Sequence, residues 1–143
     1  MIQIQIGNFQ ECIYLSIQIP EFESPYKLTE YQKRCAENHL LLIAFMDKKL
    51  VGFKVGYDRF KDGSFYSWLG GVLPQYRRQR VASMLANKQE GWARERGYTS
   101  IRLKTWKKHQ AMLELCIHRG FTIIEEIPKN PEIESRIWLK KQL

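Results

Sequence analysis

The sequence has few cysteines and no long apolar stretch. None of its 143 residues belongs to a run of about 18 consecutive apolar residues, so nothing predicts a membrane-spanning helix. Its three cysteines are odd in number and widely spaced, which favours neither a metal-binding pattern nor a disulfide framework. Residues 1–6 lack the basic region and the cleavage site of a secretory signal. We therefore expect a reduced, cytoplasmic location.

What the sequence does have is the composition of a folded, basic domain. Hydrophobic residues make up 44% of the chain and aromatic residues 13%, as in globular proteins. There is no internal repeat, low-complexity segment or dividing linker, so we expect a single domain over residues 1–143. The formal charge of +8 favours an anionic partner such as nucleic acid, anionic lipid or a polyanionic cofactor. One cofactor would not neutralise that charge, which leaves an acidic acceptor open.

The middle of the chain predicts three antiparallel strands. Residues 40–46 form a continuous apolar run, as expected of a central strand that is buried on both faces. Residues 50–57 return as the second strand of a hairpin, and the Asp62-Gly63 turn leads into a third strand over residues 64–72. Gly70-Gly71 within that third strand indicates a bulge or a close backbone approach, and a bulge would splay the strand from its parallel neighbour.

The C-terminal part predicts a parallel strand, a helix and two more strands. Residues 100–106 alternate cleanly, and their position after a helix makes this strand parallel to the strand before it. Residues 109–119 form a helix that Gly120 closes. Residues 121–127 and 133–139 form the last strands. The terminal strand offers an edge for pairing, which leaves a homodimer open.

The N-terminal part predicts a strand and two helices. Residues 1–6 alternate as a half-buried strand, and residues 9–19 form a helix with Asn8 as its N-cap. Thr29 and Gln32 have the spacing of a capping box at the start of a short second helix. The whole order predicts a mixed α/β (α+β) fold. Its central sheet has about seven mostly antiparallel strands, with helices on both faces.

A basic turn joins the third strand of the middle region to a helix over residues 81–96. The first N–H groups of a helix have no intrahelical partner and lie at the positive end of its dipole, so a helix start is an anion site. Ala82 and Ser83 are small where a ligand would approach the backbone. Arginine suits bidentate phosphate contacts. Three arginines surround this helix start: Arg77, Arg78 and Arg80. A solvated basic turn is the alternative interpretation.

This turn resembles the acyl-CoA-binding motif of the GNAT superfamily of N-acetyltransferases. The matching residues are Val72, Pro74, Arg77, Ala82 and Leu85. Arg80 departs from the motif because it stands at the first glycine position. A positive φ there would cost an arginine about 1 kcal/mol. The order of predicted elements is also that of the family, which implies a V-shaped split between the fourth and fifth strands.

The resemblance implies an acyl-CoA-dependent N-acyltransferase. The expected reaction moves acetyl from acetyl-CoA, as co-substrate, to a primary amine of a small molecule, protein or peptide by direct attack, without a metal. The backbone near Val72 would polarise the thioester. The implied cofactor-binding residues are Gly71, Val72, Arg77, Arg78, Gln79, Arg80, Val81, Ala82, Ser83 and His109.

The family's second motif is only partly present. It reads Asn-x-x-Ala-x-x-Leu-Tyr-x-x-x-Gly-Phe, and the matching residues here are Leu115, Gly120 and Phe121. His109, Met112 and Cys116 stand where the family has Asn, Ala and Tyr. The family's Tyr often protonates the leaving thiolate, so Cys116 is a candidate proton donor, with a small buried side chain as the alternative. Tyr66 is a second candidate, relaying a proton through water, with sheet packing as its alternative.

The acceptor site and the general base are less defined. The resemblance implies an acceptor site lined by residues 21–31 and 57–66, with Glu21, Tyr26 and Tyr57 as candidate contacts. Acidic Glu21 and Glu23 would suit a cationic amine. The same two carboxylates and Asp58 are candidate bases, although each also fits a surface charge, and no base is assigned.

Two other functions remain as alternatives. The substitutions at Arg80, His109 and Cys116 suggest a CoA-binding protein that has lost catalysis. Lysines interleaved with aromatic residues, as around Trp106, would suit a basic nucleic-acid-binding module that stacks bases over a charged groove. The sequence contains no recognised nucleic-acid-binding motif.

Overall fold

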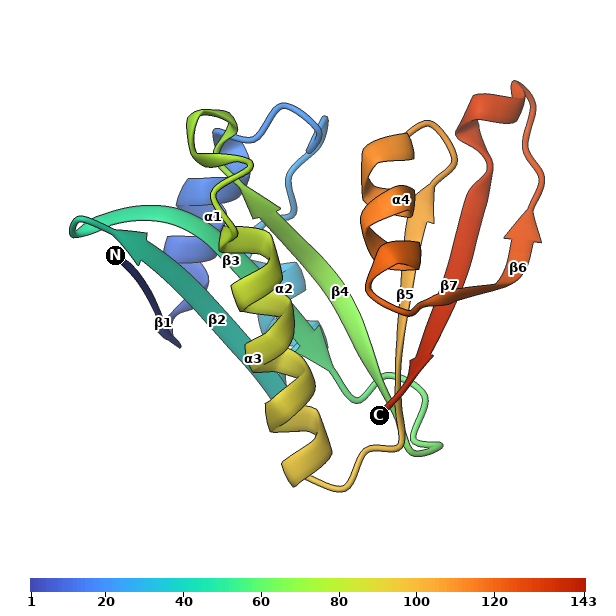
Figure 1. Ribbon diagram of the computed structural model, residues 1–143, viewed down its shortest axis with the longest axis horizontal. Coiled ribbons are helices and arrows are strands. Elements are labelled where there is room, and N and C mark those ends of the chain that lie inside the picture. Colours follow the sequence, from blue (N-terminus) through green and yellow to red (C-terminus); the bar gives the residue numbers. More distant parts are fainter.

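The computed structural model describes residues 1–143 and contains one seven-stranded sheet (Figure 1). The strand order is β1-β2-β3-β4-β5-β7-β6, and every neighbouring pair is antiparallel except β4 and β5. This arrangement confirms the predicted mixed, mostly antiparallel sheet. The strands are β1 (Ile2–Ile6), β2 (His39–Met46), β3 (Lys49–Tyr57), β4 (Ser64–Val72), β5 (Ser100–Trp106), β6 (Thr122–Ile127) and β7 (Arg136–Gln142).

Helices cover the sheet on both sides, as predicted. The first pair is α1 (Phe9–Ile17) and α2 (Leu28–Arg34), and the second is α3 (Val81–Glu95) and α4 (Gln110–His118). Figure 1 shows the first pair behind the sheet and the second in front of it. We call these sides the α1/α2 face and the α3/α4 face, and each has its own buried apolar cluster. None of the helices is long and apolar enough to cross a membrane.

The sheet splits between β4 and β5. These two strands pair only where Ser64–Ser67 of β4 lies beside residues 100–103 of β5. Beyond that join β4 stays paired with β3, and β5 stays paired with β7. Figure 1 shows the two strands diverging into a V. We call β1–β4 the N-terminal arm and β5–β7 the C-terminal arm.

The bulge that was predicted at Gly70-Gly71 lies at Trp68 instead. The register between β3 and β4 shifts there, because Val55 faces Leu69 whereas Gly56 faces Ser67. Both glycines are regularly paired, and the close approach that the sequence offered as the alternative accounts for them. A Cβ on Gly71 would lie 2.8 Å from Ile19 Cδ1, and one on Gly70 would lie 3.3 Å from the Phe53 carbonyl oxygen.

The predicted N-cap is confirmed for α1 but not for α2. Asn8 caps α1 as predicted: its side chain accepts from the Glu11 N–H at 2.9 Å, and Glu11 accepts from the Asn8 N–H at 2.9 Å. The capping box at Thr29 is wrong. The N-cap of α2 lies two residues earlier, at Lys27, which supplies no side-chain hydrogen bond, and the helix begins at Leu28.

The predicted last strand exists, but its bounds and its expected place at an edge of the sheet are wrong. The segment Glu132–Glu134 forms a 3-10 turn, so the strand starts only at Arg136. It inserts between β5 and β6 and is paired on both sides. The open edges of the sheet are therefore β1 and β6, and not β7.

Candidate active site

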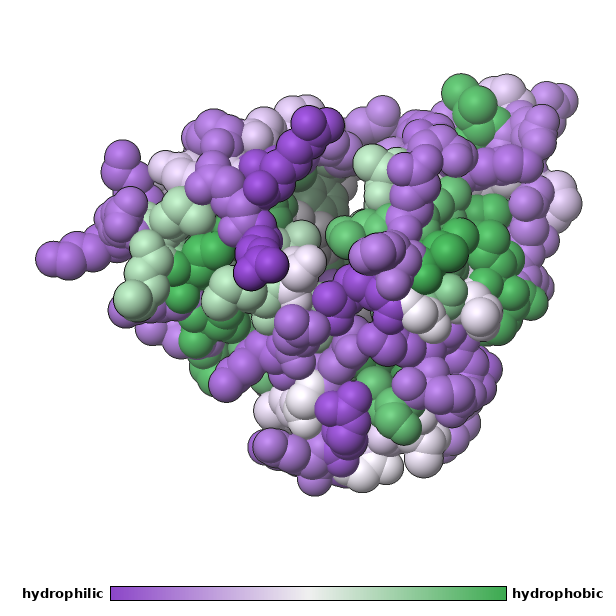
Figure 2. All heavy atoms as spheres, in the orientation of Figure 1, coloured by the Kyte–Doolittle hydropathy of each residue, from purple (hydrophilic) through white to green (hydrophobic).

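The basic turn holds two arginines in a conformation that glycine favours. Arg80 is the N-cap of α3 with φ +70°, and Arg78 has φ +63°. A left-handed conformation costs a non-glycine residue about 1–2 kcal/mol. No side chain caps α3, so the first N–H groups of this helix remain available to an anion. Figure 2 shows hydrophilic residues over this turn, beside a hollow that separates it from α4.

Arg77 is already engaged within the chain. Its Nε donates to the Val72 carbonyl oxygen at 3.1 Å, and its two terminal nitrogens donate to the Glu21 carboxylate at 2.9 and 2.7 Å. The hydrogen bond from Arg77 holds the pKa of Glu21 below its ordinary value. This predicted cofactor residue therefore ties the basic turn to the α1–α2 linker, whereas Arg78 and Arg80 form no ion pair.

The free edge of β4 leads from the split to this turn. Leu73 N–H donates to the Val51 carbonyl at 2.8 Å, which fixes the alternation of hydrogen bonds between β3 and β4. By that alternation, the backbone groups of Gly71 point to β3, and those of Gly70 and Val72 point into the split. The N–H groups of Gly70 and Val72 therefore line one wall of the V, whereas the Val72 carbonyl oxygen already accepts from Arg77.

The opposite wall starts at His109, the N-cap of α4. Its ring stacks on Trp106 with 6.1 Å between centroids. Burial lowers the pKa of His109, and nearby Lys108 adds to the effect, while Glu21 and Glu23 oppose it. Lys108 Nζ lies 3.7 Å from the Glu23 carboxylate. The α1–α2 linker thus contacts both arms, through Glu21 on one side and Glu23 on the other.

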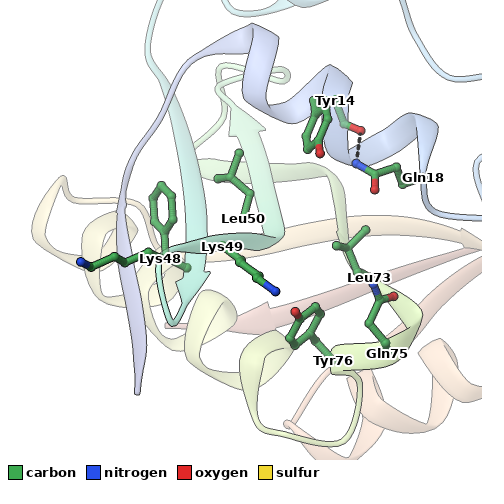
Figure 3. A pocket seen from close by; sticks show the side chains of 9 residues that line it. Tyr14, Gln18, Lys48, Lys49, Leu50, Leu73, Gln75 and Tyr76 are labelled. Atoms are coloured by element: carbon green, nitrogen blue, oxygen red, sulfur yellow. Dashed lines mark hydrogen bonds between the residues drawn. The ribbon is translucent and has the colours of Figure 1, made fainter.

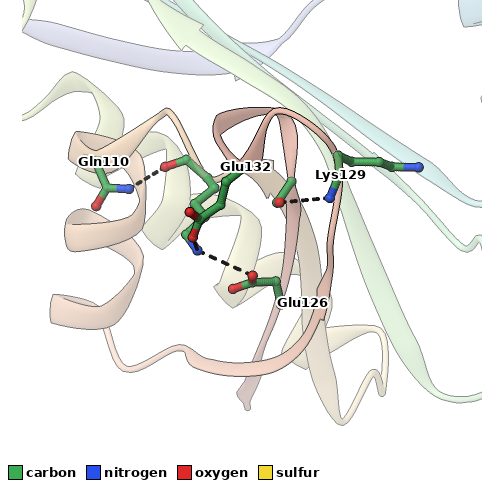
Figure 4. A network of polar contacts seen from close by, with 6 residues as sticks. Gln110, Glu126, Lys129 and Glu132 are labelled. Atoms are coloured by element: carbon green, nitrogen blue, oxygen red, sulfur yellow. Dashed lines mark hydrogen bonds and ion pairs between the residues drawn. The ribbon is translucent and has the colours of Figure 1, made fainter.

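A polar network holds this start of α4 in place (Figure 4). Lys107 Nζ lies 2.5 Å from Glu132 and 3.4 Å from Glu126, and its carbonyl oxygen accepts from the Gln110 side chain. The Lys129 N–H donates to Ser135 Oγ at 3.0 Å. These contacts fix the β5–α4 turn against the loop before β7, and so position His109.

The two candidate proton donors lie on opposite faces of the sheet. Cys116 is buried in the α3/α4 cluster, and burial raises its pKa although Lys54 and Arg119 offset part of the effect. Tyr66 is buried in the α1/α2 cluster, and burial raises its pKa although Arg59 offsets part of it. Both groups are therefore protonated near neutral pH, and the structure does not bring them together.

The candidate acceptor residues divide in a similar way. Tyr26 and Tyr57 both pack on Trp68, with ring centroids 5.0 and 5.9 Å away, and form an aromatic wall on the α1/α2 face. Glu21 lies apart, in its ion pair with Arg77. Sequence reasoning missed Arg34, whose guanidinium lies 4.6 Å from the centre of the Trp68 ring. In the sequence, Arg34 is only a cation near aromatic residues, and this does not reveal that its side chain lies on the same face of the sheet as Trp68.

The three carboxylates considered as bases all have partners. Glu21 pairs with Arg77, and Glu23 lies beside Lys108. Asp58 accepts from the Tyr98 hydroxyl at 3.2 Å and from the Lys61 N–H at 3.2 Å. No group of three or more His, Cys, Asp or Glu side chains is arranged to hold a metal ion.

A separate pocket of about 520 Å³ lies on the N-terminal arm (Figure 3). Side chains of α1, the β2–β3 hairpin and the segment before the basic turn surround it, among them Tyr14, Lys49 and Tyr76. It contains none of the residues that the sequence assigned to the cofactor, the acceptor or catalysis.

Comparison with known proteins assigns the chain to a family. Residues 9–121 match the family model described as the acetyltransferase (GNAT) family, and the chain therefore belongs to that family. No curated protein matches the sequence significantly.

Among solved structures, the chain is similar to the ribosomal-protein-S18-alanine N-acetyltransferase of Escherichia coli, at 15% identity and TM-score 0.85, over 99% of this chain and 94% of that one. It is also similar to Ard1 of Thermoplasma volcanium, at 16% identity and TM-score 0.84, over 99% and 97%. A third is the PaiA N-acetyltransferase of Thermoplasma acidophilum in complex with coenzyme A, at 13% identity and TM-score 0.76, over 100% and 99%. At these identities the likeness concerns the fold.

Proposed function

We propose that this protein transfers an acetyl group from acetyl-CoA to a primary amine, which attacks the thioester directly. The observation that carries the proposal is the uncapped start of α3, flanked by two arginines without ion pairs and placed beside the split. Coenzyme A carries a pyrophosphate, and free helix N–H groups with guanidinium neighbours suit such an anion. The solved structure of the PaiA N-acetyltransferase with coenzyme A supports the same ligand class.

The residues of this chain fit acetyl-CoA at three places. The N–H groups of Val81, Ala82 and Ser83, with Arg78 and Arg80, would hold the phosphates. The backbone of Gly70 and Val72 would bind the extended arm along β4. His109, on the opposite wall of the split, would contact the cofactor from the other side. Bound acetyl-CoA supplies an acetyl group already activated as a thioester.

The chain provides little acid or base assistance by itself. Tyr66 and Cys116 hold their protons at neutral pH because burial raises both pKa values. A thiol leaving group with a pKa near 8.5, like that of cysteine, departs without much help, so the missing family Tyr is tolerable. Since the candidate carboxylates are paired, we infer that water takes the proton of the amine.

A charge-removal experiment tests the cofactor assignment. The double variant Arg78→Gln/Arg80→Gln should raise the Kd of acetyl-CoA about tenfold or more, because each hydrogen bond to a charged group contributes about 1.5–3 kcal/mol. The matched control Arg94→Gln removes an exposed arginine at the other end of α3 and should leave the Kd unchanged. Calorimetric titration with acetyl-CoA measures both. An unchanged Kd in the double variant would contradict the assignment.

A CoA-binding protein without catalysis is the second candidate. The buried Cys116 at the family's Tyr position and the paired carboxylates favour it. Thiol release in a panel of amines separates the two functions. Binding of acetyl-CoA without release of thiol by any amine would favour the second candidate.

A further inference from the structure

Cations from four elements gather on the α1/α2 face where the split begins. Lys104 is the first residue of β5 beyond its pairing with β4, which ends at Leu103. Lys104 is exposed, but neighbouring groups partly desolvate its amine and so lower its pKa, and the charges of Arg59, Arg136 and Arg34 lower it further. These neighbours come from the β3–β4 loop, β7 and α2, so the fold itself brings them together.

Aromatic rings form cation–π contacts with these cations. Lys104 Nζ lies 5.3 Å and Arg59 Cζ 5.6 Å from the centre of the Trp138 ring, so the two charges share one indole. Arg59 also lies 4.8 Å from the Tyr66 ring. Arg136 lies 3.7 Å from the ring of Trp106. Cation–π contacts hold the charged groups in place while leaving their hydrogen-bond donors free.

Three of the cations have no carboxylate partner. Arg34 is paired with Glu30 at 2.7 Å. Lys104, Arg59 and Arg136 form no ion pair, and Arg136 donates only to the backbone oxygen of Glu134. Like charges that a fold holds close repel one another, and an anion placed among them removes that repulsion.

We propose that the acceptor is an anionic amine, in which a carboxylate or phosphate lies a few bonds from the amino group that is acylated. Lys104, Arg59 and Arg136 bind the anionic group on the α1/α2 face. Lys104 stands at the point where β4 and β5 separate, so the amine of such a molecule reaches the split. This inference rests on the proposed function and names its acceptor class.

The proposal reverses the charge expected of the acceptor from the sequence. Glu21 and Glu23 suggested a cationic amine, but their carboxylates lie against Arg77 and Lys108. An ammonium group without an acid would enter a region of uncompensated positive charge. An anionic acceptor also gives the overall charge of +8 a role that one cofactor does not fill.

Matched amine pairs test the proposal with acetyl-CoA and the wild-type protein. β-Alanine is compared with propylamine, phosphoethanolamine with ethanolamine, and putrescine represents cationic acceptors. We expect kcat/KM for at least one anionic member to exceed that of its match without the anionic group about tenfold or more. The pair with the larger ratio tells whether carboxylate or phosphate is preferred.

The variant Lys104→Gln should lose about tenfold in kcat/KM for the preferred anionic amine and less than about twofold for its match without the anionic group. Lys88→Gln, at an exposed position of α3, is the control and should behave as wild type. As a readout without turnover, calorimetry should detect the preferred anionic amine binding to the protein–CoA complex, and weaker binding to the Lys104→Gln complex. The Kd of acetyl-CoA should not change.

Two results would overturn the proposal, and they differ in what else they affect. If putrescine or the amines without an anionic group are acylated at least as well as the anionic ones, the acceptor class is wrong but the acetyltransferase function stands. If no amine releases thiol and no anionic amine binds to the protein–CoA complex, both the acceptor class and the transfer activity are wrong.

Discussion

The two arms of the sheet differ in how many of their faces are covered. In the N-terminal arm, Phe53 is buried against the α1/α2 side and Leu42 against the α3 side. In the C-terminal arm, α4 covers one face, where Leu103 is buried, while Lys104 on the other face is exposed. Burial of apolar area is the main stabilising contribution in folding. The N-terminal arm therefore carries most of the core, and the C-terminal arm presents side chains to solvent at the split.

Contacts on both faces of the sheet join the arms. The parallel pairing of β4 with β5 is short. On the α3/α4 face, the Glu90 carboxylate of α3 lies 2.8 Å from Arg119, after α4, and 2.8 Å from Lys141 of β7. On the α1/α2 face, Glu23 reaches Lys108. The packing within the N-terminal arm and the ion pairs between the arms can each be tested by substitution.

The largest expected effect concerns packing in the N-terminal arm. A Cβ on Gly56 would lie 2.3 Å from Phe65 Cε2 and 2.7 Å from the Tyr66 carbonyl oxygen. Gly56→Val should therefore lower the free energy of unfolding by about 3 kcal/mol, as overpacking of a full core does. Urea denaturation measures the change.

The control for Gly56 is Gly91→Ala in α3, where a Cβ meets nothing within 4 Å. Alanine in a helix interior should raise the free energy of unfolding by about 0.5–1 kcal/mol. A loss below about 1 kcal/mol for Gly56→Val would mean that the N-terminal arm adapts to extra volume, against its dense packing.

The second prediction concerns the ion pairs of Glu90 that connect the two arms. Glu90→Gln should lower the free energy of unfolding by about 2 kcal/mol at pH 7, because it weakens hydrogen bonds to two cations. Glu95→Gln, at an exposed position in the same helix, should change it by less than about 0.5 kcal/mol. Equal effects of the two substitutions would show that the Glu90 contacts contribute nothing beyond surface charge.

The pH dependence of Glu90 follows from its pKa. Burial raises this pKa, but the hydrogen bonds from Lys141 and Arg119 outweigh burial and hold it below the usual 4.5. A carboxylate with a lowered pKa stabilises the fold above the unfolded-state value, and the contribution disappears as the pH falls through the folded-state value. The advantage of wild type over Glu90→Gln should be complete at pH 6–7 and fade below about pH 4.5.

Local patterns in the sequence predicted much of the fold. The bounds of β4 and β5 were predicted correctly because both strands follow clear apolar or alternating patterns. The bulge was misplaced because its position depends on the register between β4 and β3, and this register cannot be predicted from the sequence of one strand. The same holds for β7, whose place between β5 and β6 is a property of the whole sheet.

The candidate site divides in the same way. The basic turn was visible because a helix start and its arginines are neighbours in sequence. The pair of Arg77 and Glu21 joins residues 56 positions apart, and the cations around Lys104 come from three other segments of the chain. Such groupings arise only when the strands are ordered in space, so the sequence alone suggested a cationic acceptor.

The smallest expected effect on stability is at the start of α3, where one substitution should change stability and cofactor binding in opposite directions. Arg80 has φ +70°, so Arg80→Gly should relieve strain and raise the free energy of unfolding by about 1 kcal/mol. Arg94→Gly makes the same replacement inside α3, where it should lower that free energy by about 1 kcal/mol. If Arg80 binds phosphate, Arg80→Gly also raises the Kd of acetyl-CoA about tenfold while the protein becomes more stable. Urea denaturation and calorimetry of both variants decide this, and a loss of stability in Arg80→Gly would show that the turn is not strained.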